Sequence, residues 1–168
     1  MDNDCKVGFV YTPTQIGADG QIISQQEVGN LMPAEMIAYM LNACFKGGSQ
    51  NTTFYISLFE NNYTPQASDT MTTFIAACGE NTTYTTSGTN RLTLTLPSPV
   101  AGSITTSSAP NEFDFTGAAT IRGAFITTGL TRGGTTGLLV SAALFASPFT
   151  LANLGTLRVP VGFALVSA

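Results

Sequence analysis

The sequence predicts a mainly β protein, an antiparallel β-sandwich of jelly-roll-like type with an N-terminal extended arm and one or two short helices. Three observations lead to this prediction. Several short segments alternate apolar and polar residues, as at Leu92, Leu94 and Leu96. Turns rich in Gly, Pro and Ser separate these segments. The regular alternation of strands with long helices that builds parallel sheets is missing.

Residues 1–32 are expected to form the arm, and residues 33–168 the sandwich domain. The segment from Val7 to Tyr11 is strand-like, whereas the segment from Gln21 to Asn30 is polar with little periodicity. Such a stretch has too little apolar surface to fold alone. It therefore packs either on its own domain or across a neighbouring molecule, and the neighbour is the expected site.

The clearest helix is predicted over residues 33–46. Pro33 suits the first helical turn, Glu35 the positive end of the helix dipole, and Lys46 the last turn before two glycines. Apolar pairs recur along it at helical spacing and predict a buried stripe that packs on the core, with a ligand surface as the alternative for the methionines. These pairs are Met36/Ile37, Met40/Leu41 and Cys44/Phe45.

Strand-like periodicity starts at residue 53 and returns near the C-terminus. Ser68 or Asp69 is expected to cap a short helix through Phe74 that ends near Gly79. Two later strands, 138–145 and 159–166, are apolar on both faces. Because one face of an antiparallel sandwich strand is normally wet, their outer faces are predicted to be buried against another subunit. The expected strands are residues 53–59, 91–96, 112–116, 120–127, 138–145 and 159–166.

Charge is scarce in this chain. Asp, Glu, Lys and Arg make up 10% of the 168 residues, against roughly 25% in ordinary soluble domains. Thr, Ser, Asn and Gly take their place. Since charge keeps a surface hydrated and apart from its neighbours, this composition predicts a protein whose surface is covered in an assembly, with a homo-oligomer, a dimer or trimer, as the expected state.

The same totals argue against several partners. The net charge is −4 and the six basic residues are scattered, so no cluster follows a phosphate backbone and no nucleic acid is expected. No apolar run approaches the ~18–20 residues that span a bilayer, so no membrane association is expected. The N-terminus, which begins Met-Asp-Asn-Asp, is acidic and does not resemble a signal peptide.

Residues for catalysis are equally scarce. The chain has no His, which excludes Ser–His–Asp and Cys–His nucleophiles and His-based metal sites. Cys5, Cys44 and Cys78 form no CxxC pair, so neither a metal nor a cofactor is expected. Cys44 and Cys78 are predicted to be small buried hydrophobic residues. We therefore expect no catalytic, cofactor-binding or metal-binding residues and no enzyme.

Three patterns carry weaker alternatives. Glu112 and Asp114 share one face of a strand, as a glycosidase pair or calcium ligands would, but the polar face of a half-buried strand is favoured. The Gly-rich run 130–137 resembles a phosphate-binding loop but lacks its Lys-Ser/Thr end, and a strand connection is favoured. The aromatic residues between Phe54 and Tyr63 could stack bases, but they have no basic residues among them and core packing is favoured.

The run FYISLFENNYTPQASDT, residues 54–70, resembles a feature of small structural proteins of tailed phages: a strand ending in Leu-Phe, an Asn-rich turn, Thr-Pro, and an acidic residue before a short helix. The later half is similar to theirs as well. The apolar strand IRGAFI at 121–126, a Gly-bearing turn, Leu138-Leu139 leading to Phe145, Pro148 and a final alternating strand follow in order. The resemblance covers roughly residues 33–168.

This resemblance implies a head decoration or cement protein located in the virion, on the outside of the capsid, and made in the host cytoplasm. Its partner would be the major capsid protein, and its arm would help to clamp neighbouring capsid subunits. A protein that binds two capsid subunits at once stabilises only the assembled shell. A phage tail, baseplate or fibre component and a carbohydrate- or receptor-binding β-sandwich module remain the alternatives.

Overall fold

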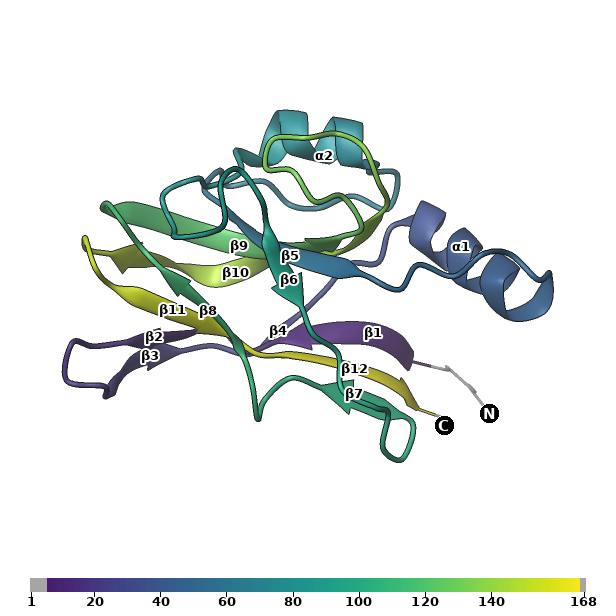
Figure 1. Cartoon of the computed structure of the whole chain (residues 1–168), viewed down its shortest axis with the longest axis horizontal. Coiled ribbons are helices and arrows are strands. Elements are labelled where there is room, and N and C mark those ends of the chain that lie inside the picture. The colour runs from purple at the N-terminus through teal and green to yellow at the C-terminus, as the bar shows by residue number, and fades with distance from the viewer. Residues whose placement is uncertain (1–5, 167–168) are drawn as a thin grey trace.

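The computed structural model describes residues 6–166, and Figure 1 shows its arrangement. Strands take 42% of the chain and helices 13%, so the prediction of a mainly β protein is confirmed. The elements in chain order are β1 (Lys6–Tyr11), β2 (Thr14–Ile16), β3 (Ile22–Gln25), β4 (Val28–Gly29), α1 (Ala34–Phe45), β5 (Phe54–Phe59), α2 (Met71–Cys78), β6 (Leu92–Leu94), β7 (Ser103–Thr105), β8 (Asn111–Asp114), β9 (Ala119–Thr127), β10 (Leu139–Leu151), β11 (Thr156–Val159) and β12 (Val161–Val166).

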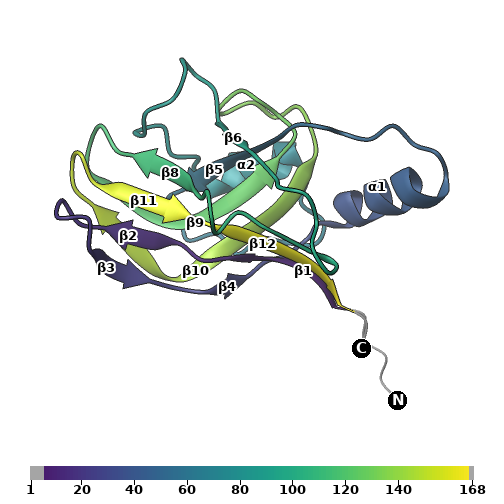
Figure 2. The ribbon, with the colours of Figure 1, turned by 60° about the horizontal axis from the view of Figure 1, so that its bottom comes forward.

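The strands form three antiparallel sheets that make two layers. One layer is the sheet β10-β9-β5-β6, and the other consists of the sheets β4-β1-β12-β7 and β3-β2-β11-β8, placed end to end (Figures 1 and 2). Pro13 separates β1 from β2, and Pro160 separates β11 from β12. Proline has no N–H to donate to a ladder. The carbonyl of Pro160 still accepts a hydrogen bond from the Thr12 N–H at 3.0 Å, which ties the two sheets together.

The main core fills the space between the layers. Inward side chains such as Tyr11 and Phe113 from one layer meet Leu58 and Ile121 from the other, and all four are fully buried or nearly so. Val159 at the end of β11 and Val161 at the start of β12 are buried and face this core, as the alternating pattern predicts, but Pro160 divides the single strand expected over 159–166. The two layers are therefore held together mainly by apolar burial.

The strand order does not establish the jelly-roll connectivity expected from the sequence. In a jelly roll, consecutive strands pass from one layer to the other. Here β9 and β10 follow each other in the chain and pair within one sheet, as do β2 and β3. The architecture shown is a two-layered arrangement of antiparallel sheets. Within residues 6–166, neither helix is long and apolar enough to cross a membrane.

The expected arm is part of the sandwich as far as the structure describes it, and the prediction that it lies on a neighbour is wrong for residues 6–32. Strand β1 lies inside its sheet and pairs with β12 over six residues. The polar stretch that follows stays in place through hydrogen bonds. Asn30 accepts from the Phe9 N–H at 2.7 Å and donates to the Ser141 hydroxyl at 2.7 Å. Residues 1–5 of the predicted arm lie outside the described residues.

Helix α1 exists where it was expected, but its predicted buried stripe is wrong in large part. Met36 is buried, whereas Ile37, Leu41 and Phe45 are exposed by 48%, 55% and 79%. Cys44, predicted to be buried, is exposed as well. The reason is that α1 projects from one end of the sandwich, with only one side against the body (Figures 1 and 2). Periodicity predicts an apolar face but not the surface that covers it.

Helix α2 covers the outer face of the sheet β10-β9-β5-β6. Its buried residues Met71, Phe74 and Cys78 pack in a second apolar cluster with Phe59, Phe125, Leu139 and Ala142. The outer face of β10 is therefore covered by the chain's own helix, and the prediction that another subunit buries it is wrong. The helix is capped by Thr70 through a reciprocal pair with Thr73, not by Ser68 or Asp69, and it ends at Gly79 as predicted.

Candidate interaction surfaces

The predicted carboxylate pair makes ordinary contacts with the neighbouring strand. Glu112 and Asp114 are both exposed on β8, opposite β11. Glu112 forms an ion pair with Arg158 at 2.5 Å, and Asp114 accepts a hydrogen bond from the Thr156 hydroxyl at 2.7 Å. Each carboxylate is already paired across the strands. Within residues 6–166, no three side chains of the types His, Cys, Asp and Glu gather as a metal site would require.

The Gly-rich loop 130–137 holds an anion that belongs to the protein itself. The N–H of Gly133 donates to the Glu80 carboxylate at 2.7 Å. The guanidinium of Arg91 contacts both oxygens of the same carboxylate at 2.7 and 2.8 Å. It also donates to the carbonyl of Gly129 just before the loop and to that of Gly134 within it. The loop is thus fixed by Glu80 and Arg91, as the connection between β9 and β10.

This ion pair is the center of a buried polar network. The side chains of Arg91 and Glu80 are exposed by 0% and 3%. The Ser57 hydroxyl donates to Glu80 at 2.6 Å and lies 2.8 Å from the Tyr84 hydroxyl. Arg132 stacks over the Tyr84 ring at 4.9 Å from its centroid and donates to backbone carbonyls of the 82–88 segment. No described buried side-chain polar atom lacks a partner, so the network rigidifies this end of the molecule.

The aromatic residues between Phe54 and Tyr63 form no flat platform. Phe59 is fully buried and meets Phe74 edge to face, with ring centroids 5.6 Å apart. The Tyr63 hydroxyl donates to Asp69 at 2.8 Å, and Phe54 lines an apolar pocket described below. Core packing, the favoured interpretation of these residues, is confirmed for Phe59.

Burial raises the pKa of three groups in the interior and, with the neighbouring Asp69, that of the half-buried Tyr63. It raises the pKa of the Cys78 thiol from 9.0 to about 12. It likewise raises the pKa of the Tyr84 phenol from 10.0 to about 12, against the opposing effect of the hydrogen bond with Ser57. Burial also raises the pKa of Tyr11, whose hydroxyl donates to Ser141 at 2.8 Å. All three groups are neutral in the folded protein at pH 7.

These raised pKa values predict a loss of stability at high pH. Above about pH 9 the unfolded chain releases protons that the folded protein retains, so the free energy of unfolding falls until about pH 12. Each group can contribute up to about 1.4 kcal/mol per pH unit inside that window. Urea unfolding at successive pH values measures the slope, and Tyr84→Phe should make it shallower above pH 10. A flat profile from pH 8 to 11 would contradict this expectation.

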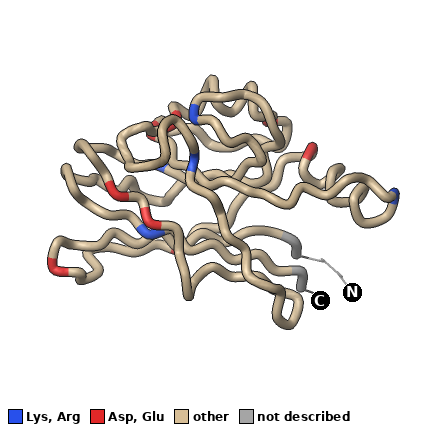
Figure 3. Tube along the Cα trace, in the orientation of Figure 1, with Lys and Arg blue, Asp and Glu red and all other residues tan. Residues whose placement is uncertain are grey.

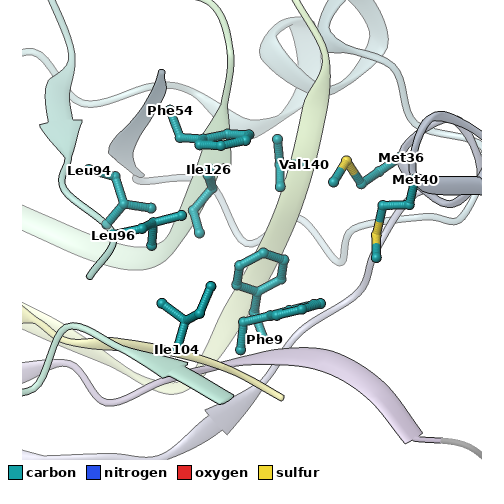
Figure 4. Close-up of a pocket in the computed structure, with 10 residues that line it drawn as sticks. Phe9, Met36, Met40, Phe54, Leu94, Leu96, Ile104, Ile126 and Val140 are labelled. Carbon is teal, nitrogen blue, oxygen red and sulfur yellow. The ribbon is translucent and has the colours of Figure 1, made fainter. Parts of the chain in front are cut away.

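An apolar pocket opens at the end of the sandwich beside α1 (Figure 4). It has a volume of about 220 Å³. Both layers contribute inward side chains, and α1 adds two methionines whose flexible side chains adapt to different shapes. The lining residues are all apolar: Phe9, Met36, Met40, Phe54, Leu94, Leu96, Ile104, Ile126, Val140 and Phe163.

The outer face of one sheet remains exposed to solvent. The outer face of the sheet β4-β1-β12-β7 presents six residues without charge, which we call the uncharged sheet face. Pairing of Val10 with Gly162 and of Gly162 with Thr105 sets its register, and Val10 near its middle is 39% exposed. Figure 3 shows charged residues of this layer near β8, β11 and the β2–β3 turn. Two more charged residues flank the face: Glu27, which is exposed directly before β4, and Lys6, the first residue of β1. The six residues are Val10, Gly29, Ser103, Thr105, Gly162 and Ala164.

Sequence reasoning missed the ion pair and the pocket. The only available signal for the ion pair was the isolation of Glu80 and Arg91 in a stretch with no other charge. The pocket had no signal, because its ten residues come from eight strands or helices and one connecting segment. Their proximity depends on how the layers and α1 are placed.

Comparison with known proteins adds no assignment. No protein-family model, no curated protein and no solved structure matches this chain.

Proposed function

We propose that this chain is a non-enzymatic viral structural protein, a capsid cement or decoration protein that binds the outer surface of the major capsid protein shell. The observation that carries the proposal is the uncharged sheet face. Of the two layers, one has its outer face covered by α2, whereas the uncharged sheet face is open and presents small, uncharged side chains around Val10. A flat, uncharged surface can be desolvated against a partner without the cost of burying unpaired ions.

The charge distribution supports the same function. Of the 16 charged residues in the chain, Asp69 and Arg91 are buried and Glu80 is nearly so. The surface therefore carries even less charge than the composition indicates. Interfaces of stable assemblies are depleted of charge at their centers. The hydroxyls of Ser103 and Thr105 on this face can instead exchange hydrogen bonds with water for hydrogen bonds with a shell subunit.

The experiment combines the purified chain with shells assembled from the major capsid protein of the same genome. Co-sedimentation should give saturable binding, and cryo-electron microscopy should place the chain on the outside of the shell. Val10→Lys would place a charge at the middle of the uncharged sheet face and should weaken binding by ~10-fold or more. Leu130→Lys, an exposed apolar residue in the 130–137 loop, is the matched control and should bind normally.

Three results would overturn the proposal. These are the absence of binding to shells, density confined to the tail of the virion, and equal binding by the Val10→Lys and wild-type proteins. Density on the tail would support the alternative of a tail, baseplate or fibre component. A carbohydrate-binding module is not favoured by the described surface, where Phe45 is the only exposed aromatic residue.

A further inference from the structure

Helix α1 presents a continuous apolar face to solvent. The face follows helical spacing over the full length of the helix, and each of its residues is exposed. The opposite side faces the body, where Met36 is buried and Tyr39, Met40 and Ala43 are half-buried. The exposed face consists of Ala34, Ile37, Ala38, Leu41, Cys44 and Phe45.

This exposure is costly for a helix of this length. Isolated helices shorter than about 12–15 residues are marginal in water, and packing of an apolar face normally stabilises them. Only one of the 12 residues of α1, Met36, is buried. The largest side chain on the apolar face, Phe45, is also the most exposed, at 79%. A surface that covers the exposed face would stabilise both the helix and its position.

The order of residues on this face is self-complementary. If two copies of α1 lie antiparallel with Leu41 against Leu41, Ile37 of each copy meets Phe45 of the other. In the same register Ala38 meets Cys44, so large side chains lie opposite large ones and small side chains opposite small ones. A two-fold axis requires this property, since the same patch must serve on both copies.

Charge selects the antiparallel orientation as well. Glu35 lies in the first turn, and Lys46 directly follows the last turn. Helical spacing puts both on one flank, outside the apolar face; one Glu35 oxygen already accepts the Leu139 N–H at 3.0 Å, and the other oxygen remains for a partner. Antiparallel pairing brings Glu35 of one copy to the level of Lys46 of the other and aligns the helix dipoles favourably. Parallel pairing would bring like charges together at each end.

We propose that two copies of this chain associate through α1, packed antiparallel about Leu41. The projection of α1 beyond the sandwich leaves it accessible to a second copy (Figures 1 and 2). Six side chains along one short helix bury less than the about 1,200 Å² of typical stable interfaces. The dimer is therefore reversible, with a dissociation constant on the order of 10 μM. This contact is separate from the uncharged sheet face and does not depend on binding to a shell.

Sedimentation equilibrium of the full chain tests the proposal. The apparent mass should rise from 17.5 kDa toward twice that value as the protein concentration increases through the micromolar range. Leu41→Lys, which places two like charges on the two-fold axis, should leave a monomer at all concentrations. Val100→Lys changes another exposed apolar residue, 73% accessible and outside α1, and should leave the dimer intact. Thermal unfolding of both variants checks that they fold.

Crosslinking tests the register. Leu41→Cys, with Cys5 and Cys44 replaced by Ser, should form a disulfide-linked dimer under mild oxidation, whereas Val100→Cys in the same background should not. A wild-type monomer at all concentrations would overturn the proposal, as would a dimer that survives Leu41→Lys. A wild-type monomer whose binding to capsid shells is lost on Leu41→Lys would assign the helix face to the shell protein instead.

Discussion

Replacing Glu80 with alanine is expected to lower the free energy of unfolding by about 3–5 kcal/mol, because it leaves the Arg91 guanidinium buried without its counter-ion. Arg91 is 0% exposed in its side chain and cannot turn to water without leaving the carbonyls of Gly129 and Gly134. The N–H of Gly133 also loses its acceptor. Urea unfolding followed by circular dichroism measures the change.

Two further variants separate charge from hydrogen bonding. Glu80→Gln keeps an acceptor for Gly133 and Ser57 but removes the charge, so its cost should lie between wild type and Glu80→Ala. Glu112→Ala is the matched control, since its ion pair with Arg158 is about half exposed and should contribute no more than about 1 kcal/mol. If Glu80→Ala and Glu112→Ala cost the same, the buried network does not fix the loop as described.

Replacing Phe74 with alanine is expected to lower the free energy of unfolding by about 3–5 kcal/mol. Phe74 is fully buried on the side of α2 that faces the sheet, and its ring contacts those of Phe59, Tyr63 and Phe125 at centroid distances of 5.6, 5.9 and 5.1 Å. Removing it deletes the center of the second apolar cluster and creates a cavity beside the sheet. Thermal or urea unfolding measures the loss.

This variant also tests whether α2 alone covers that face of the sheet. Thr72→Ala, on the exposed side of the same helix, should change stability by less than about 0.5 kcal/mol. Loosening of α2 in Phe74→Ala should make the buried Cys78 reactive toward a thiol reagent at pH 8. A small cost for Phe74→Ala, with Cys78 still unreactive, would contradict the packing of α2 on the sheet.

The two proposed interfaces assign different roles to different parts of the molecule. The uncharged sheet face would attach the chain to a shell, and α1 would join two attached copies. Linking two weak contacts raises the effective concentration of the second, so the combined attachment exceeds either contact alone. A reversible dimer is then sufficient, because the shell brings copies close together.

Much of the fold was predictable because short-range patterns control it. Most of the expected strands, the helix at 33–46 and the glycine that ends the helix at residue 79 follow from periodicity and local backbone preferences and are found. The strands β2, β3, β4 and β7 were not predicted, and the strand expected over 159–166 is divided between two sheets. Local patterns also predicted strand-like structure at Val7–Tyr11 within β1. They could not show that β1 lies inside a sheet next to β12, because that pairing joins residues 150 or more positions apart.

The sequence by itself determined a mainly β chain with little charge and the positions of its helices. Only the tertiary structure decided which apolar faces are covered. Helix α2 closes over its sheet, whereas α1 packs only one side on the body and leaves an apolar face with Phe45 in solvent, although both carry an apolar face at the same spacing. The physical reason is that periodicity records the presence of a face, whereas burial depends on what the rest of the chain places against it. Scarce charge predicted a covered surface, and the structure locates its open parts at the uncharged sheet face and at α1.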